Sequence, residues 1–200
     1  MFQPVQFCSM TDSPELIDAV AGVLAREPGS SMQEIAAAAG VSRTTLHRAF
    51  GDRAALVERV SRYVLADCER LFDEAGIDDA PVLEAFNCLI AAPLRLGKAY
   101  AMLLAEPGSY QNSELVGEIR SQDDRFERYF ARGQDAGVFR RDLPPRWLVY
   151  SVGCQTIALW WAVDDGFVGS REAGRLLRAT VLEGIAGRGT DTAPGGEAGP

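Results

Sequence analysis

Seven polar residues near the N-terminus lie close together and carry side-chain groups that bind a nucleic-acid duplex. They are Ser42, Arg43, Thr44, Thr45, His47, Arg48 and Arg53. Arginine forms paired hydrogen bonds with guanine edges, and serine and threonine hydroxyls bond to bases or phosphates. The residues expected to hold phosphate oxygens, and so to fix the position of the protein, are Thr45, His47, Arg48 and Arg53. This pattern predicts contact with double-stranded DNA.

These side chains need a helix that presents them, and residues 31–52 predict one. Ser31 and Glu34 have the spacing of a capping box, which starts a short helix. Gly40 follows the last apolar position of that helix, where a left-handed C-cap favours a residue without Cβ. Ser42 then caps a second helix, whose N-terminal residues can reach base edges. Two short helices joined in this way predict a helix-turn-helix, with its second helix in the DNA major groove.

An apolar face must hold this motif on the rest of the protein. Leu46 faces inward from the second helix, and Phe50 is expected to fill the centre of a three-helix bundle. The first helix of that bundle starts at Asp12 or Ser13, with Pro14 at its first helical position. The alternative is a helical corner with a solvated charged face. The two caps, the glycine and the inward apolar residues together favour the DNA-binding interpretation.

The chain resembles TetR-type transcriptional regulators over their DNA-binding signature, here EIAAAAGVSRTTLHRAFGDRAALVERV. The resemblance covers about Pro14 to Val64, and the rest of the chain is similar only in helix pattern and length. It implies an all-helical homodimer with an N-terminal helix-turn-helix and a C-terminal domain for ligand binding and dimerisation. The family usually has a phosphate-contacting Tyr where this chain has His47, and often a Lys where Arg53 is the nearby cation.

Helical periodicity continues along the chain without an alternating strand pattern, so the expected fold class is all-α. We expect an N-terminal three-helix helix-turn-helix domain, joined by a long helix to a C-terminal helical ligand-binding and dimerisation domain. The expected parts are a flexible arm at 1–11, the helix-turn-helix domain at 12–66, the effector-binding and dimerisation domain at 67–186 and a tail at 187–200. The tail has low complexity, which predicts disorder.

Two features of the C-terminal domain concern its helices. A helix over about 81–104 contains Pro93, which should kink or split it. A helix over about 145–163 is apolar on all sides and must be buried on more than one of them. With a last helix over about 170–185, it could pair with its copy across a twofold axis to form a homodimer. The alternative is one larger monomeric core.

The aromatic side chains of this domain predict a site for a small hydrophobic effector. An apolar cavity with a few polar groups suits such a ligand. The candidates for its lining lie on two helices that are expected to face each other: Phe126, Tyr129, Phe130, Trp147, Tyr150 and Cys154. The alternative for each of them is a place in the plain hydrophobic core. Effector binding would release the DNA through a coupling free energy between the two sites.

The chain has a net charge of −8, which is unusual for a DNA-binding protein. Residues 1–66 hold six Arg against seven Asp or Glu, whereas residues 67–200 hold 14 basic and 21 acidic residues. From Ser42 to Arg53, three Arg stand against one Asp. The acidity therefore lies mostly away from the proposed DNA-binding helix, and the nonspecific affinity for DNA should be modest.

No metal, cofactor or membrane is expected as a partner. The cysteines, Cys8, Cys68, Cys88 and Cys154, are widely spaced and form no C-x-x-C pair, which argues against a zinc site. Three of them fall in apolar helical patterns, which predicts buried thiols. The N-terminus lacks the basic and apolar regions of a signal peptide, and no stretch is apolar enough to span a bilayer. A cytoplasmic protein is therefore expected.

The sequence lacks the motifs of common enzyme classes, because it has no G-x-S-x-G, no phosphate loop and no H-E-x-x-H. The pairs Asp123/Asp124 and Asp164/Asp165 are adjacent residues that point apart on a helix, so we expect a solvated surface or helix caps there. The sequence predicts a ligand-responsive DNA-binding transcriptional regulator, a repressor released from a palindromic operator by a small hydrophobic effector. The alternative is a helical ligand-sequestering or interaction protein whose helix-turn-helix no longer binds DNA.

Overall fold

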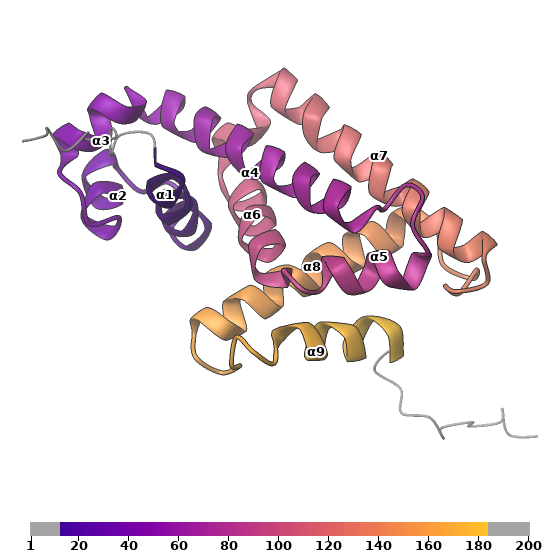
Figure 1. The fold of residues 1–200 in the computed structure, drawn as a ribbon. Helices are drawn as coiled ribbons and strands as arrows, with labels where there is room; N and C mark the ends of the chain where they lie inside the picture. The colour runs from indigo at the N-terminus through magenta and orange to yellow at the C-terminus, as the bar shows by residue number, and fades with distance from the viewer. Residues whose placement is uncertain (1–12, 184–200) are drawn as a thin grey trace, which may run out of the picture.

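The computed structural model describes residues 13–183, and every regular element in that range is helical (Figure 1). The α-helices are α1 (Pro14–Arg26), α2 (Met32–Ala38), α3 (Arg43–Phe50), α4 (Arg53–Ala75), α5 (Val82–Leu89), α6 (Pro93–Ala105), α7 (Ser113–Asp135), α8 (Pro145–Asp164) and α9 (Ala173–Arg178). A 3-10 helix, η2 (Pro107–Tyr110), connects α6 to α7. The predicted all-α fold class is confirmed. The arm expected at 1–11 and the tail expected at 187–200 lie outside the described residues.

Helices α1 to α3 form a small bundle, the head, at one end of the molecule (Figure 1). Each of the three starts at a serine, Ser13, Ser31 or Ser42, whose hydroxyl accepts a backbone N–H from the first helical turn. At the start of α2, the Glu34 carboxylate also accepts the N–H of Ser31 at 2.8 Å, which completes the predicted capping box. Gly40, at a φ of 70°, lets the chain turn from α2 toward α3.

Helix α4 carries the chain out of the head and across the second part of the molecule (Figure 1). It starts at Asp52, whose carboxylate accepts the N–H of Ala55 at 2.9 Å. It ends at Gly76, which has the left-handed conformation of a C-cap. The long helix predicted between the two parts of the chain is therefore present. The domain boundary predicted between residues 66 and 67 falls inside α4 and stays a prediction.

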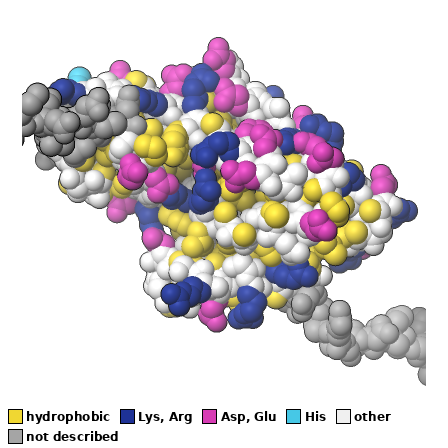
Figure 2. Space-filling model, viewed as in Figure 1, with side chains coloured by type: hydrophobic (Ala, Val, Ile, Leu, Met, Phe, Trp, Pro, Cys, Tyr) yellow, Lys and Arg dark blue, Asp and Glu magenta, His cyan; other side chains and the backbone are white. Residues whose placement is uncertain are grey.

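Two arginines tie α4 to α7. Arg62 of α4 pairs with Glu118 of α7 at 2.6 Å, and it also pairs with a second glutamate of α7. Arg125 of α7 reaches back to α4, where it pairs with Glu69 at 2.5 Å and with Asp73 at 2.7 Å. Figure 2 shows dark blue and magenta side chains next to one another on the face turned to the viewer. These ion pairs connect the outer sides of two long helices.

The stretch predicted as one helix over 81–104 is two helices in the structure. Helix α5 ends at Leu89, α6 starts at Pro93, and the two are bent by 73°. Proline lacks an N–H and has a fixed φ, so it is suited to the first position of a new helix and not to the middle of one. Within residues 13–183, no single helix is both long and apolar enough to cross a membrane. Within the same residues, only α5 and α6 taken together are long and apolar enough for a membrane span. Both helices contribute buried residues to the core.

Helix α6 packs against α8 and also against α1 of the head. The approach of α6 to α8 depends on Gly97, because a Cβ atom there would lie 2.2 Å from the carbonyl oxygen of Thr156. On the side of α1, Lys98 pairs with Asp18. Most of the buried apolar residues form one contiguous cluster from the head to α8. The head therefore does not depend on its own small core, and its position is tied to that of α6.

The last helical segment starts later than the helix predicted over 170–185, whose last two residues lie outside the described part of the chain. Helix α9 starts at Ala173 and continues into π-helical turns at Ala179–Glu183. Ala173 and Leu177 pack with Leu159 of α8. The chain passes close to the end of α5 here, because a Cβ atom at Gly174 would lie 2.7 Å from the carbonyl oxygen of Ile90.

Candidate DNA-contacting surface and effector pocket

Helix α3 turns its polar side chains outward, as predicted. Arg43, Thr44, His47 and Arg48 are exposed, and Thr45 is half-buried. Over residues 13–183, neither Arg43 nor Arg48 takes part in an ion pair, so both guanidinium groups are available to a ligand. A short helix with two available arginines and two threonines can donate to base edges and phosphates.

The rest of the head fixes the direction in which α3 points. The Ser42 hydroxyl accepts the N–H of Thr45 at 3.0 Å and lies 2.8 Å from the Thr45 hydroxyl, so both groups shape the start of the helix. On the inner side, Leu46 is fully buried and Phe50 nearly so. Arg59 of α4 donates at 2.8 Å to the carbonyl of Ala49 near the end of α3, and its guanidinium lies 5.4 Å from the centre of the Phe50 ring.

Arg53, predicted as a further DNA contact, points into the protein. Its Nε donates to the carbonyl of Ser30 at 2.9 Å. Its terminal nitrogens donate to the two carboxylate oxygens of Glu106 at 3.2 and 2.7 Å. The Glu106 side chain is only 1% exposed, whereas that of Arg53 is 33% exposed. The geometry gives no support to a DNA contact by Arg53, which stays a prediction.

The carboxyl group of Glu106 is charged although it is buried. Burial raises its pKa, but the hydrogen bonds from Arg53 and from the N–H of Gly108, together with the charge of Arg53, outweigh burial and lower the pKa. The turn that carries Glu106, between α6 and η2, lies against α4. There the hydroxyls of Ser109 and Ser61 are 3.2 Å apart and buried. The start of α4, directly after α3, is thus joined to the end of α6.

A cavity of about 300 Å³ lies between α6, η2, α7 and α8. This volume is at the lower end of the range of about 300–1,000 Å³ typical of ligand pockets. Its wall is mostly apolar and includes Leu103, Leu104, Val116, Ile119, Val149 and Ile157. Its polar and charged lining residues include Tyr100, Tyr110, Arg120, Gln122, Asp123 and Tyr150. An apolar cavity with a few polar groups fits the predicted site for a small ligand.

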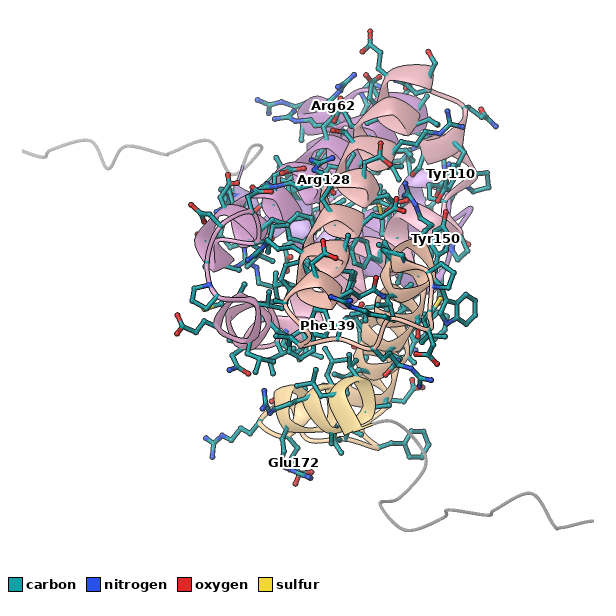
Figure 3. All side chains as sticks on the ribbon, turned by 90° about the vertical axis from the view of Figure 1, so that its right-hand side faces the viewer. Arg62, Tyr110, Arg128, Phe139, Tyr150 and Glu172 are labelled. Atoms are coloured by element: carbon teal, nitrogen blue, oxygen red, sulfur yellow. The ribbon has the colours of Figure 1, made fainter. Side chains whose placement is uncertain are left out.

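The half-buried carboxylate of Asp123 lies among tyrosines in this pocket. Burial raises the pKa of Asp123, while the charge of Arg146, whose guanidinium is 3.6 Å away, acts in the opposite direction. Burial, together with nearby negative charge that includes Asp123, raises the pKa values of Tyr100 and Tyr110, so both phenols stay protonated. Figure 3 shows Tyr110 and Tyr150 on the same side of α7. The pocket therefore combines one carboxylate with hydroxyl donors and aromatic rings.

The structure places the six predicted ligand-binding residues in three different environments. Tyr150 and Cys154 line the 300 Å³ cavity. Phe126 borders a neighbouring cavity of about 20 Å³, which is too small for an effector. Tyr129 and Phe130 are buried in an aromatic cluster, where the Tyr129 hydroxyl donates to the carbonyl of Val82 at 2.8 Å. Trp147 is 56% exposed on α8. Their role in ligand binding stays a prediction, which the geometry supports for Tyr150 and Cys154.

Several lining residues of the pocket were not predicted from the sequence. Tyr110 and Arg120 lie in segments with no aromatic run or periodic signal that points to a pocket. Asp123 was expected at the solvated surface because it precedes a second aspartate, but it is half-buried in the pocket. Only the packing of α7 against α8 turns Asp123 inward and Asp124 outward.

The cysteines differ in exposure. Cys68 is buried, as predicted, and burial raises its pKa to about 12. The expectation of buried thiols is wrong for Cys88 and Cys154, which are exposed. Cys8 lies outside the described residues. In the part of the chain that the structure describes, no group of three or more His, Cys, Asp or Glu is arranged to hold a metal ion.

One face of α8 is apolar and exposed. Trp147, Tyr150, Cys154, Ala158 and Trp161 recur at helical spacing along this face, and the three aromatic residues are each about half exposed. The other sides of α8 are buried against α6, α7 and α9. Exposed aromatic side chains that line up on one helix are typical of a protein–protein interface.

The sequence matches a known protein family and known proteins. A sequence model of the family described as bacterial regulatory proteins, tetR family, matches residues 21–60, which run from α1 through α3 into α4. The HTH-type transcriptional repressor LfrR of Mycolicibacterium smegmatis is 30% identical over 132 residues, covering 66% of this chain and 68% of LfrR. The chain belongs to the TetR family. The HTH-type transcriptional regulator NfxB of Pseudomonas aeruginosa is also 30% identical to this TetR-family chain, over 64% of its length and 70% of NfxB.

A solved structure is similar over nearly the whole TetR-family chain. It is the crystal structure of the TetR-like transcriptional regulator LfrR from Mycobacterium smegmatis in complex with proflavine. The TM-score is 0.66 at 25% sequence identity, and the match covers 86% of this chain and 95% of LfrR. The resemblance first seen in the helix-turn-helix is confirmed by these matches. This TetR-family chain is a transcriptional regulator.

Proposed function

We propose that this protein is a repressor that binds a palindromic operator as a homodimer in the cytoplasm and leaves it when a small, mostly apolar effector binds. The observation that carries the proposal is the outer face of α3, where Arg43 and Arg48 are exposed and free of ion pairs within the described residues. No catalytic step is part of this proposal. The domain division at 12–66 and 67–186 follows the same logic, with DNA contact in the first part and effector binding in the second.

The exposed apolar face of α8 supports dimerisation. Two copies that pair through α8 and the neighbouring α9 would bury Trp147 and Trp161 of each copy. A twofold axis through this interface would place two α3 helices in symmetric positions, so each would read one half-site. Tyr150 and Cys154 belong both to this face and to the pocket lining, and the partner would therefore lie close to the pocket.

The pocket between α6, α7 and α8 supports effector binding. Its size and mostly apolar wall suit a small organic molecule. LfrR, which is similar over most of this chain, has been solved in complex with proflavine. By analogy, we propose that the pocket of this chain takes a compact aromatic effector.

A chain of contacts can carry the effect of the ligand to α3. Leu103 and Leu104, on the last turn of α6, and Tyr110 of η2 line the pocket. Glu106 lies between them and pairs with Arg53 at the first position of α4. A ligand that displaces the end of α6 would move Glu106 and, through Arg53, the helix that directly follows α3. Coupling between two such sites is typically worth about 1–3 kcal/mol, or a change of roughly 5- to 150-fold in operator affinity.

Substitution of the outer face of α3 tests the proposed DNA contact. Arg43→Ala should weaken binding to the selected operator by about 1–3 kcal/mol and relax its selectivity, because a bidentate base contact is worth that much. Thr44→Ala removes a single hydroxyl contact and should change affinity and selectivity in the same direction by less. Gel-shift titration measures both effects. The matched control is Arg70→Ala, which removes a 58% exposed arginine of α4 that pairs with Asp67. Unchanged affinity and selectivity in both α3 variants would rule out this helix as the DNA-binding element.

A ligand-sequestering protein with an inactive helix-turn-helix is the alternative, and the net charge of −8 favours it. Salt dependence separates the two functions. A DNA-binding dimer should lose affinity as salt rises, with a logarithmic slope of about −0.9 per phosphate contacted. A flat line, or no operator at all, would support sequestration.

A further inference from the structure

One end of the effector pocket carries more negative than positive charge. Asp123, Asp124 and Glu127 all pair with a single guanidinium, that of Arg146. Arg146 lies closest to Asp124, is 2.7 Å from Glu127 and is 3.6 Å from Asp123. Of the three carboxylates, Asp123 therefore has the weakest share of the positive charge.

Asp123 is also the carboxylate of this group that lines the pocket. Its side chain is 30% exposed, against 55% for the neighbouring Asp124. A partly desolvated carboxylate that shares its cation with two other carboxylates is incompletely neutralised, and a positive charge placed beside it inside the pocket would relieve that cost. Asp124 lies closest to Arg146 and faces outward, so it is a much weaker site for the positive charge of a ligand.

Aromatic rings line the same cavity as this carboxylate. Tyr100, Tyr110 and Tyr150 line the same cavity, and the charge of Asp123 acts on the first two phenols. The face of an aromatic ring attracts a cation placed over it, and the attraction grows when water is excluded. A carboxylate among three tyrosines offers a ligand cation both a counter-charge and ring faces.

Arg120, the other charged lining residue, does not neutralise the charge of Asp123. Arg120 is exposed, so solvent screens its charge. Among the described residues Arg120 forms no ion pair with Asp123, whereas Arg146 does, at 3.6 Å. The remaining wall, with Leu103, Leu104 and Ile119, suits an apolar ring system.

We propose that the effector is an amphipathic organic cation, with an apolar body between α6 and α8 and its positive charge beside Asp123. This rests on the proposed function, since it names the class of molecule that the same pocket takes. Asp123 is the residue that selects cations over neutral molecules of equal shape, and Tyr110 and Tyr150 contribute ring faces.

The test compares two ligands of the same ring size in the full-length protein. They are 10-methylacridinium, which is permanently cationic, and acridine, which is neutral at mildly alkaline pH. Fluorescence titration should show the cation bound about tenfold more tightly than acridine, the ratio that corresponds to about 1.4 kcal/mol. Asp123→Asn should remove that preference by weakening only the cation. Asp124→Asn removes the same charge one position away, and it should change the preference by less than about twofold because exposed pairs contribute little.

Each outcome bears on the proposal separately from the function of the protein. Equal binding of both ligands, or a preference that survives in a folded Asp123→Asn variant, overturns the assignment of a cation. If acridine binds equally well and also releases the operator in gel-shift assays, the repressor function stands and only the ligand class is wrong. If neither ligand binds, the proposed ligand class is overturned, whereas operator binding by the free protein still tests the DNA-binding function. Thermal melting of both variants confirms that they are folded.

Discussion

Replacing Arg53 by methionine is expected to lower the free energy of unfolding by about 2–3 kcal/mol at neutral pH, because the buried carboxylate of Glu106 loses its cation. Removal of one partner of a fully buried ion pair costs about 3–5 kcal/mol, and the one-third exposure of Arg53 reduces that figure. The variant should still bind effector, but effector binding should no longer release the DNA. The reason is that the contact between the end of α6 and the start of α4 is broken.

Urea unfolding at fixed protein concentration measures the first effect. The matched control is Arg62→Met, the same substitution on the same helix at an arginine whose partners Glu114 and Glu118 are 76% and 43% exposed. It should cost less than about 1 kcal/mol. Glu106→Gln combined with Arg53→Met should cost less than the sum of the single changes, and additive costs would show that the two residues do not interact.

The pH dependence of this pair has a definite sign. The pKa of Glu106 is lowered in the folded protein, so its contribution to stability is fully present above the ordinary pKa of a glutamate. The contribution is lost as pH falls through the lowered pKa. The difference between wild type and Arg53→Met should therefore be full at neutral pH and shrink in acid. If the free energies of unfolding of wild type and Arg53→Met differed by the same amount at neutral and at acid pH, the role given to the ionised carboxylate would be contradicted.

Replacing Phe50 by alanine is expected to have the largest effect on stability, about 3–5 kcal/mol, as for other large aromatic residues removed from a core. Phe50 is 5% exposed and packs between α3 and α4, with Arg59 over its ring. Loss of the ring removes a large part of the inner support of α3, which Phe50 shares with Leu46, so operator binding should fall along with the melting temperature.

A graded variant separates cavity formation from other causes. Phe50→Leu keeps most of the volume and should cost no more than about 1.5 kcal/mol. Urea unfolding and gel shifts on both variants measure the two effects. If alanine were tolerated as well as leucine, Phe50 would not be the residue that holds α3 in place.

The head could be predicted in detail because its signals are local. Ser31 and Glu34 cap α2, Gly40 ends the turn, and Ser42 caps α3, all within a few positions of the groups they bond. Pro93 likewise predicted the break between α5 and α6. Caps, glycines with positive φ and prolines act on their own neighbours, so the sequence alone contains what decides them.

The pocket and its connection to the head could not be predicted, because they depend on residues far apart in the chain. Arg53 was expected to face DNA because it follows the recognition helix, but its partner Glu106 lies 53 positions away. Tyr129 and Phe130 were predicted to line the pocket because they are aromatic residues on a helix that faces α8. In the structure they belong to the buried aromatic cluster. Tyr110 and Asp123 meet in the pocket only because η2, α7 and α8 pack together.

The shared core gives the coupling a structural basis. Helix α6 contacts both α1 of the head and α8, which carries the exposed apolar face. Arg26 at the end of α1 adds a second connection, since it pairs with Asp165 at 2.9 Å next to the end of α8. A change in the position of α6 or α8 would therefore move the head as well as the turn that carries Glu106. In a dimer joined through α8, such a change would alter the distance between the two α3 helices.

Selection of bound sequences from random duplex DNA tests the central claim most directly. A dimer that presents two α3 helices should enrich two inverted half-sites, separated by about one helical turn of roughly 10 base pairs or a multiple of it. Arg43→Ala should broaden the base preference within each half-site. Enrichment of a single unrepeated site, or of no sequence at all, would contradict the account.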